Sequence, residues 1–271
     1  MDITSYTTGP LLNVAEIINL SESFTMPGEF GEFRRWSYRG QPREYQSLVP
    51  SFQRIFESKP FGAAEIIEQD LIAAFRSHYA ELPDRSTDMP LPDAIANDDL
   101  QCLSVMQHYE VPTRLLDWTS DFWTAIYFAC ASEPEHDAEL WIYDRKIFDS
   151  QKIEKKKTAA SFLTRRDDHL IVELDPRLTP RMRQQNAHHT VSANVFADHA
   201  PLLYELLEHL PTTDDEPFRF HRVIIAKTCK SKALRFLADH IKITASTIFP
   251  DVVGLGRFLR WHLDSLRTML L

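Results

Sequence analysis

The segment at residues 36–41 is the first that suggests a chemical function. It reads Trp-Ser-Tyr-Arg-Gly-Gln, and a glycine at this point favours a turn or a close approach between backbones. Its apolar neighbours suggest the end of a strand, which would direct Arg39 from a rigid element into a cavity. A guanidinium group there can hold an anion through two parallel hydrogen bonds. The alternative is that Arg39 is buried against a core carboxylate such as Asp117, and the sequence leaves both interpretations open.

The segment at residues 107–119 alternates hydrogen-bonding groups with large apolar side chains. It reads Gln-His-Tyr-Glu-Val-Pro-Thr-Arg-Leu-Leu-Asp-Trp-Thr. Pro112 favours an extended conformation for the residue before it, so the part that follows is predicted as a strand or rigid loop leading into the cap of a helix. Along such a strand, Thr113, Leu115 and Asp117 would share one side.

Burial of so many unpaired polar groups would be unfavourable, at about 1–3 kcal/mol for each group. Mutual contacts remove that cost, although the residues lie far apart in the sequence. We therefore predict one polar cluster that contains Arg39, Thr113, Arg114, Asp117 and Gln185.

Hydrophobic periodicity predicts the elements that must position these groups. Apolar residues recur at three- and four-residue steps, the spacing of one helix face, over residues 63–82, 231–240 and 251–270. Further helices are predicted at 100–109 and after the cap residues Thr119-Ser120-Asp121, with a loop over 84–99. Two short runs rich in β-branched and aromatic residues, 139–144 and 219–226, are predicted as strands.

Strands separated by helical patterns indicate an α+β fold. We predict a single domain with a mixed central sheet, in which the two predicted strands pair and the helices at 63–82 and 251–267 flank the sheet. The expected division of the chain is an N-terminal extension at 1–35, the main domain at 36–257 and a C-terminal helical tail at 258–271.

The composition argues against several classes of protein. The 30 lysines and arginines against 39 acidic residues give a net charge of −9, which disfavours a general electrostatic grip on nucleic acid but is compatible with a local basic patch. With only 7 glycines, the chain contains no GxxxxGK[S/T], GxGxxG or GxSxG motif. Its three cysteines, Cys102, Cys130 and Cys229, are too scattered for a metal knuckle or a disulfide framework, which favours a reducing compartment.

The sequence predicts a cytoplasmic protein that binds neither a membrane nor a metal. The chain begins with an acidic rather than a basic segment, and its longest apolar run, 123–131, is too short to span a bilayer. Its histidines at 188, 189 and 199 lack the HxxxH and HExxH spacings of helical metal sites. The basic run at 152–166 is interpreted as the solvated face of a loop.

The two polar segments closely resemble the FRG domain family. The resemblance rests on Tyr38-Arg39-Gly40, on Gln107-His108-Tyr109 and on the block Pro112-Thr113-Arg114-Leu115-Leu116-Asp117-Trp118-Thr119, and weaker matches extend it over residues 36–257. This chain has Glu110 where the family usually has glycine, and Ala187 and His189 where it has a glycine and an aromatic residue. If these positions shape a pocket, the pocket of this chain is altered.

The resemblance implies an intracellular effector of bacteria or phages, either a toxin or a component of anti-phage defence. Its order of an Arg-Gly opening, a threonine-bearing turn and a late polar residue is similar to the three-part layout of ADP-ribosyltransferases, which implies NAD as the cofactor. In that layout, Arg39 would hold the diphosphate, Thr113 or Thr119 would position the nicotinamide, and Gln185 or Asp117 would stabilise the developing positive charge. The expected ligand contacts come from neighbouring side chains, namely Tyr38, Gln41, Arg114, Trp118 and Thr119.

A second hypothesis is a non-catalytic binding or sensing module. Such a module would use the same pocket to recognise a nucleotide, a nucleic acid or a protein partner. A cleft with room for a dinucleotide would favour the enzyme, whereas a fully satisfied ion-pair network without a cavity would favour a structural role for the polar residues.

Overall fold

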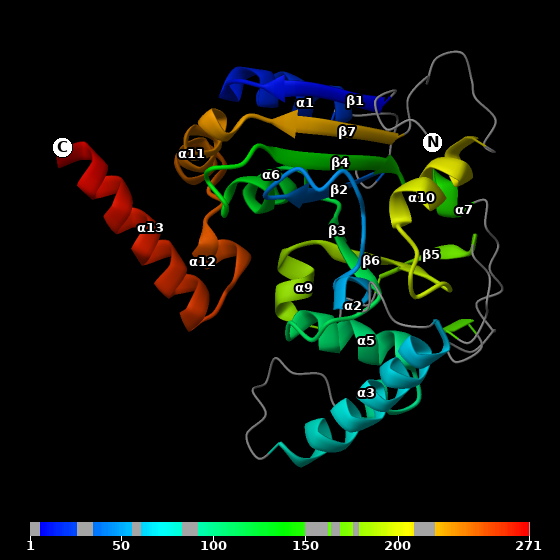
Figure 1. Ribbon diagram of the computed structural model, residues 1–271. Coiled ribbons are helices and arrows are strands. Elements are labelled where there is room, and N and C mark those ends of the chain that lie inside the picture. Colours follow the sequence, from blue (N-terminus) through cyan, green and yellow to red (C-terminus); the bar gives the residue numbers. More distant parts are fainter. Residues whose placement is uncertain are drawn as a thin grey trace.

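A mixed sheet runs through the centre of the molecule (Figure 1). The computed structural model describes residues 6–25, 35–55, 61–82, 92–149, 162–163, 169–175, 179–208 and 220–270. Within these residues the sheet has seven strands in the order β1-β7-β4-β2-β3-β6-β5. They are β1 (Thr7–Leu11), β2 (Trp36–Gln41), β3 (Leu115–Thr119), β4 (Ala138–Asp144), β5 (Ile171–Leu174), β6 (Ala187–Ser192) and β7 (Phe220–Ile225). The pair β1–β7 is parallel and every other neighbouring pair is antiparallel.

The two strands expected from the sequence lie side by side in the sheet. Strand β4 is buried along its whole length and pairs with β7, from Ala138 opposite Ile225 to Tyr143 opposite Phe220. The runs of β-branched and aromatic residues in both strands suit a position covered on both faces. The prediction of a single-domain α+β fold with a mixed sheet is confirmed.

One face of the sheet packs on helices from both ends of the chain. The helices are α1 (Val14–Thr25), α6 (Phe122–Cys130) and α11 (Lys227–Phe236), followed by the π-helical turn η2 (Leu237–Ile241) and by α12 (Ala245–Ile248). Their buried side chains form one hydrophobic cluster with sheet residues, among which are Tyr38, Leu140, Ile142, Val223 and Ile225. Strand β1 and helix α1 therefore share the central sheet and its core with the rest of the fold.

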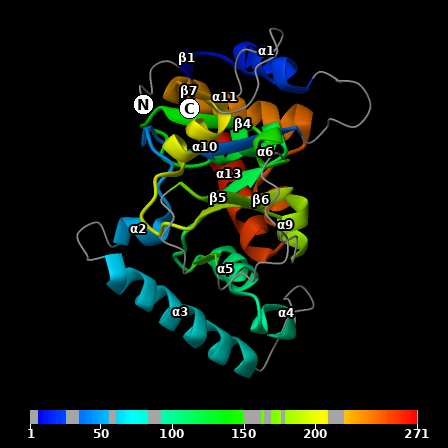
Figure 2. The ribbon, with the colours of Figure 1, turned by 90° about the vertical axis from the view of Figure 1, so that its right-hand side faces the viewer.

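The opposite face carries α10 (His199–Glu208), whose leucines pack with Trp118, Trp141 and Tyr143. A third cluster lies beyond β3 and β6, where α3 (Phe61–Glu81) and α5 (Asp99–His108) cover Leu115 and Val191. Figure 2 shows α3 and α5 as a separate layer at the end of the molecule opposite α1 and α11. The remaining short helices are α2 (Ser51–Ile55), α4 (Pro92–Ala96), α7 (Lys146–Asp149) and α9 (Pro180–Gln184).

The predicted start of the buried helix α6 is confirmed. Asp121 is its N-cap, and its carboxylate accepts a hydrogen bond of 2.6 Å from the backbone N–H of Thr124. An acceptor at this position satisfies a backbone donor that has no partner inside the helix. The cap fixes where β3 ends and α6 begins, and both elements contribute to the site described below.

Three other expectations were wrong in part. The predicted loop at 84–99 contains the helix α4, and α11 begins four residues before the predicted start at 231. The long C-terminal helix α13 (Val252–Leu270) forms as predicted, but it contacts chiefly α12 and extends away from the sheet instead of flanking it (Figure 1). The basic run at 152–166 lies outside the described residues except for positions 162 and 163.

Within the described residues, every helix is either too short or too polar to cross a membrane.

Candidate functional site

The site begins where β2 and β3 separate. Both strands belong to the same sheet, yet they share a single register pair, Tyr38 with Thr119. Beyond this pair, a side chain of β2 instead of its backbone donates to β3. Arg39 Nη1 donates to the carbonyl oxygen of Asp117 at 2.7 Å. Arg39 and Asp117 start from different faces of the sheet, because Arg39 alternates with Tyr38 whereas Asp117 shares a face with Thr119. They meet only because the strands diverge.

Gln107 connects the polar residues of the second segment. Its side-chain amide donates to Asp117 Oδ2 at 2.9 Å and accepts from the hydroxyl of Thr113 at 2.6 Å. The same Thr113 hydroxyl accepts from the backbone N–H of Leu115 at 3.1 Å. Thr113 is fully buried, so it influences the site only through Gln107, which it holds in position.

His189 lies beside Asp117 because the two residues are register partners in the β3–β6 pair. Its Nδ1 is 3.0 Å from Asp117 Oδ1, within ion-pair distance. The His189 side chain is 3% exposed, whereas the Asp117 side chain is 52% exposed. Neither ring nitrogen of His189 forms a hydrogen bond within the described part of the chain. A buried imidazole therefore stands next to a carboxylate that faces open space.

The pKa of Asp117 is lowered to about 2. Burial of the carboxyl group would raise it, but the contact with His189 and the charge of His189 outweigh that effect. The charge of Arg39 and the amide of Gln107 act in the same direction. Asp117 is consequently an ionised carboxylate throughout the physiological pH range.

These groups line a cleft of about 470 Å³, which we call the Asp117 cleft. Its walls come from β2, β3 and β6, from the end of α5 with Gln107 and His108, from α6 with Phe128, and from α9 with Arg181. The volume lies within the range of about 300–1,000 Å³ typical of small-molecule sites. The structure therefore has an accessible cavity at the polar segment instead of a closed ion-pair network.

Two arginines of the cleft have buried donors without a partner in the described residues. These donors are the Nε atoms of Arg39 and Arg181. The guanidinium of Arg181 also stacks 4.3 Å from the ring centre of Phe249. Desolvation lowers the pKa of His108 to about 4, and the charge of Arg181 adds to this effect. His108 is therefore neutral near pH 7, and the arginines carry the positive charge of the cleft.

Arg114 does not join this cluster, so the predicted convergence was wrong for this residue. Its guanidinium is 1% exposed and forms an ion pair with Glu68 of α3, with Arg114 Nε 2.8 Å from Glu68 Oε1. Arg114 Nη1 donates to the carbonyl oxygens of Ser192 and Ala193. This arginine ties the α3–α5 layer to β6 and is absent from the lining of the Asp117 cleft.

The interpretation of Arg39 as the partner of a buried carboxylate is also wrong. Arg39 contacts the backbone oxygen of Asp117, and the carboxylate itself is half exposed.

Two other predicted ligand contacts, Tyr38 and Trp118, line the cleft but are almost fully buried. Tyr38 lies 3% exposed in the core below α6, and desolvation raises the pKa of its hydroxyl group. Gln41 does not line the cleft and donates to the carbonyl of Ser47 at 3.1 Å. The indole of Trp118 is 2% exposed and donates to Thr190 at 2.9 Å. An adenine ring cannot stack on Trp118 in this position.

Gln185 and Thr119 meet at the edge of the cleft. The hydroxyl of Thr119 donates to the backbone oxygen of Gln185 at 2.7 Å, and it accepts from the N–H of Asp121 at 3.0 Å. The side chain of Gln185 lines the cleft, but its Nε2 donates to the carbonyl of Ile248 at 3.2 Å. These bonds join β3, α9 and α12, so both residues fix the cleft wall.

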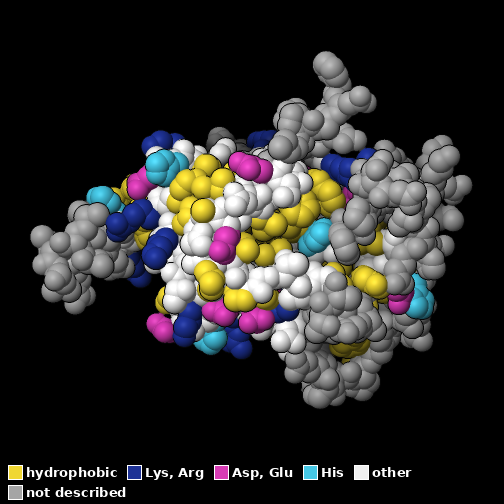
Figure 3. Space-filling view, turned by 90° about the horizontal axis from the view of Figure 1, so that it is seen from above, with side chains coloured by type: hydrophobic (Ala, Val, Ile, Leu, Met, Phe, Trp, Pro, Cys, Tyr) yellow, Lys and Arg dark blue, Asp and Glu magenta, His cyan; other side chains and the backbone are white. Residues whose placement is uncertain are grey.

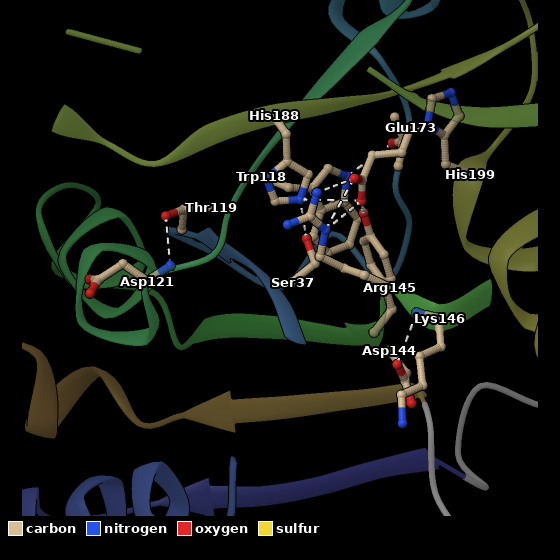
Figure 4. A network of polar contacts seen from close by, with 12 residues as sticks. Ser37, Trp118, Thr119, Asp121, Asp144, Arg145, Lys146, Glu173, His188 and His199 are labelled. Atoms are coloured by element: carbon tan, nitrogen blue, oxygen red, sulfur yellow. Dashed lines mark hydrogen bonds and ion pairs between the residues drawn. The ribbon is translucent and has the colours of Figure 1, made fainter. Parts of the chain in front are cut away.

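Behind β3 and β6 lies a buried polar network (Figure 4). The hydroxyl of Ser37 contacts Nε2 of His188, and the carboxylate of Glu173 accepts from Tyr143 at 2.9 Å and pairs with Arg145. Desolvation, together with the charge of Arg145, lowers the pKa of His188 well below its usual value. The network holds β2, β4, β5 and β6 together next to the cleft.

Three cleft residues with potential chemistry were missed from the sequence, namely Gln107, Arg181 and His189. Gln107 lies inside the polar segment at 107–119, of which only other members, such as Thr113 and Asp117, are predicted as site residues. His189 carried a signal of its own, because it replaces the aromatic residue usual at its position. It lines the cleft together with Ala187 and Glu110, so all three departures from the family pattern fall on the pocket.

The structure also explains the usual glycine at the position of Glu110. The backbone φ of Glu110 is 64°, in the left-handed region that glycine adopts without steric cost.

Among the described residues, no three His, Cys, Asp or Glu side chains gather as the ligands of a metal would.

The comparison with known proteins gives one family match, in the N-terminal half of the chain. Residues 34–138 match the family model of the FRG domain. No curated protein and no solved structure matches the chain. The matched region includes Arg39, Gln107 and Asp117, whereas Arg181 and His189 lie beyond its end. Over residues 34–138, the chain is therefore similar to the FRG domain.

Proposed function

We propose that the Asp117 cleft is the catalytic site of an intracellular effector enzyme, a toxin or defence component that uses NAD or a related nucleotide in the manner of an ADP-ribosyltransferase. The observation that carries this proposal is the pair formed by Asp117 and His189. The carboxylate lies 3.0 Å from Nδ1 of the buried imidazole, Nε2 has no partner among the described residues, and His189 lines the cleft. This is the arrangement that prepares a histidine to exchange protons with a substrate.

The charges of the cleft suit an anionic substrate with several oxygen atoms. Arg39 and Arg181 each have a buried Nε donor without a partner in the described chain. Unused buried donors of this kind are costly unless a ligand accepts from them. A diphosphate supplies charged acceptors for both guanidinium groups, which bind such oxygens in a fixed geometry.

The residues then divide the chemistry of a glycosyl transfer between them. The N-glycosidic bond of the nucleotide breaks and the base leaves with the bonding electrons, while an acceptor hydroxyl forms a new C–O bond. The ionised Asp117 stabilises the positive charge that develops on the ribose. His189 takes the proton that the acceptor loses. Gln107 keeps Asp117 in place through its 2.9 Å hydrogen bond.

The test compares purified wild type with Asp117→Asn and His189→Gln. Each protein is incubated with labelled NAD and cell extract, and nicotinamide release and labelled macromolecules are measured. We expect activity in the wild type and a loss of at least about 100-fold in both variants, the usual contribution of an acid–base group. The exposed residues Asp239 and His240 supply matched controls, Asp239→Asn and His240→Gln, which should keep full activity.

A second candidate function is the non-catalytic sensing module, because the unpartnered arginine donors would serve binding equally well. In that case NAD would raise the melting temperature of the protein without being consumed. Asp117→Asn would then change neither turnover nor cellular effect. That result would contradict the enzymatic proposal and favour the sensor.

A further inference from the structure

A second cavity lies next to the Asp117 cleft, between α13 and the end of the sheet that carries α6, η2 and α12. We call it the α13 groove. It has a volume of about 810 Å³. Its aromatic lining consists of Tyr127, Phe128, Phe249, Phe258 and Trp261. Phe128 and Ser132 line both the groove and the Asp117 cleft, so the two cavities adjoin.

Helix α13 turns aromatic and basic side chains toward the groove. Arg257, Arg260 and Trp261 line it, whereas Leu255 and Leu259 lie on another face of the helix and are about half exposed, at 48% and 54%. The rings of Phe258 and Trp261 lie 6.2 Å apart on successive positions of the same face. The guanidinium of Arg257 lies 4.8 Å from the ring centre of Phe249. The groove therefore combines ring surfaces with two exposed positive charges.

The charge of the chain is strongly divided, and the groove lies in its basic part. Residues 227–271 contain eight lysines and arginines against three aspartates, a net charge of +5. The whole chain carries −9, so residues 1–226 carry −14. Figure 3 shows lysine and arginine side chains gathered at the left-hand end of the molecule, where Figure 1 shows α11 and α13. An anionic partner is consequently attracted to this end of the molecule.

We propose that the α13 groove binds single-stranded nucleic acid. Its bases would stack on the rings of Trp261, Phe258 and Phe128, and its phosphates would contact Arg257 and Arg260. Aromatic platforms beside a basic track are the recurring means of binding single strands without sequence preference. This inference does not depend on the chemistry of the Asp117 cleft, although a strand in the groove would end at the mouth of that cleft.

The lining favours a single strand over other anionic partners. A duplex hides the faces of its bases, so it could use the arginines but not the rings. An acidic peptide would likewise pair with the arginines but has no flat apolar surfaces to cover the rings of Phe128, Phe258 and Trp261.

The test measures binding of fluorescein-labelled single strands of roughly 15 nucleotides, oligothymidylate and oligouridylate, to the full chain by fluorescence anisotropy. We expect saturable binding that weakens between about 50 and 200 mM salt, with a slope of about −0.7 for each phosphate contacted. Trp261→Ala should weaken binding at least about fivefold, the value of one lost stacking contact. The matched control Leu259→Ala, on the other face of α13, should bind as the wild type does.

Arg260 provides a second variant that cannot affect the core, because its side chain is exposed. Arg260→Ala should reduce the salt slope by about 0.7. Lys146→Ala removes the same charge at an exposed position on α7, at the other end of the molecule, and should leave the slope unchanged. Asp117→Asn should bind with wild-type affinity, which separates this test from that of the catalytic proposal.

Three results would overturn the proposal. They are the absence of saturable binding at about 50 mM salt, equal or tighter binding of a duplex of the same length, and displacement of the oligonucleotide by polyglutamate as effective as displacement by unlabelled strand. The last result would identify the groove as a docking site for acidic proteins.

Discussion

At the residue scale, Arg39 and Arg114, one from each of the two polar segments, differ in burial and in the partners of their guanidinium groups. Arg114 is enclosed by Glu68 and by two backbone carbonyls, so its charge is fully compensated inside the core. Arg39 is half-buried, makes one hydrogen bond to a backbone oxygen and retains a donor without a partner in the described chain. The first arginine is built into the fold, whereas the second is available to a ligand.

This contrast predicts different effects of the same substitution. Arg39→Ala removes a single hydrogen bond to a carbonyl and should lower the free energy of unfolding by only about 1 kcal/mol. Arg114→Ala leaves the carboxylate of Glu68 buried without a partner and should cost about 3–5 kcal/mol. Urea denaturation of the two variants and the wild type measures both values.

The same experiment in the presence of NAD separates binding from stability. If Arg39 holds an anion, the rise in melting temperature produced by NAD should disappear in Arg39→Ala. An Arg39→Ala protein that unfolds as readily as Arg114→Ala would instead identify Arg39 as a structural residue.

At the element scale, the contact between β2 and α6 depends on the absence of one side chain. A Cβ atom on Gly40 would lie 2.0 Å from the carbonyl oxygen of Ala125 and 2.6 Å from the nitrogen of Ala129, both in the backbone of α6. Because backbone atoms cannot swing aside, the glycine sets how closely the helix approaches the strand. Its neighbour Arg39 is held at the cleft by this packing.

We expect Gly40→Ala to destabilise the protein by about 1–3 kcal/mol or more, the cost of overpacking a core. Gly256→Ala is the matched control, because a Cβ there meets nothing within 4 Å and the residue lies inside α13. Alanine should stabilise that helix by up to about 1 kcal/mol. Thermal unfolding of both variants checks the prediction, and a Gly40→Ala protein as stable as the wild type would contradict it.

At the scale of the whole molecule, buried neutral histidines in the cleft and at the start of α10 make the stability of the fold depend on pH. Desolvation lowers the pKa of His199 to about 3, and the charges of Arg39 and Arg114 add to the effect. Its Nδ1 lies 2.9 Å from the hydroxyl of Thr190, which also accepts from the indole of Trp118. Nδ1 of a neutral His199 can accept a hydrogen bond from the hydroxyl of Thr190, and a protonated one cannot. His108 has a pKa lowered to about 4 for a similar reason.

The protein should therefore lose stability on acidification. Below the ordinary histidine pKa of about 6.5 the unfolded chain takes up protons that the folded chain does not, so the unfolded state is favoured as the pH falls. Each such histidine should contribute up to about 1.4 kcal/mol per pH unit between about pH 6 and pH 4. Asp117 contributes in the same direction only below about pH 4, where its unfolded form takes up a proton.

His199→Gln isolates one part of this dependence, because glutamine retains a hydrogen-bond acceptor and does not titrate. We measure its free energy of unfolding in urea at about pH 7, 5 and 4. This free energy should fall with decreasing pH less steeply than that of the wild type. The difference in slope corresponds to the uptake of up to one proton per molecule on unfolding. The same slope in both proteins would show that His199 takes up its proton equally in the folded and the unfolded state.

The sequence by itself determined several of the elements and one polar segment, because both appear as local patterns. Apolar residues at a period near 3.6 predicted α3, α11 and α13, and β-branched runs predicted β4 and β7. The density of polar groups at 107–119 indicated mutual contacts, since such groups need partners wherever they are buried, and Gln107 does bond to Thr113 and Asp117. The resemblance to the FRG domain rested on these same two segments.

Only the tertiary structure decided which polar groups meet. His189 lies beside Asp117 through the register of β6 on β3, and Arg181 reaches the cleft from α9, about 70 residues after the motif. Arg114 turned into the core although it belongs to the same polar segment as Asp117. A local pattern shows that a side chain needs a partner, but the partner is chosen by strand pairing and helix packing, which depend on contacts between distant parts of the chain.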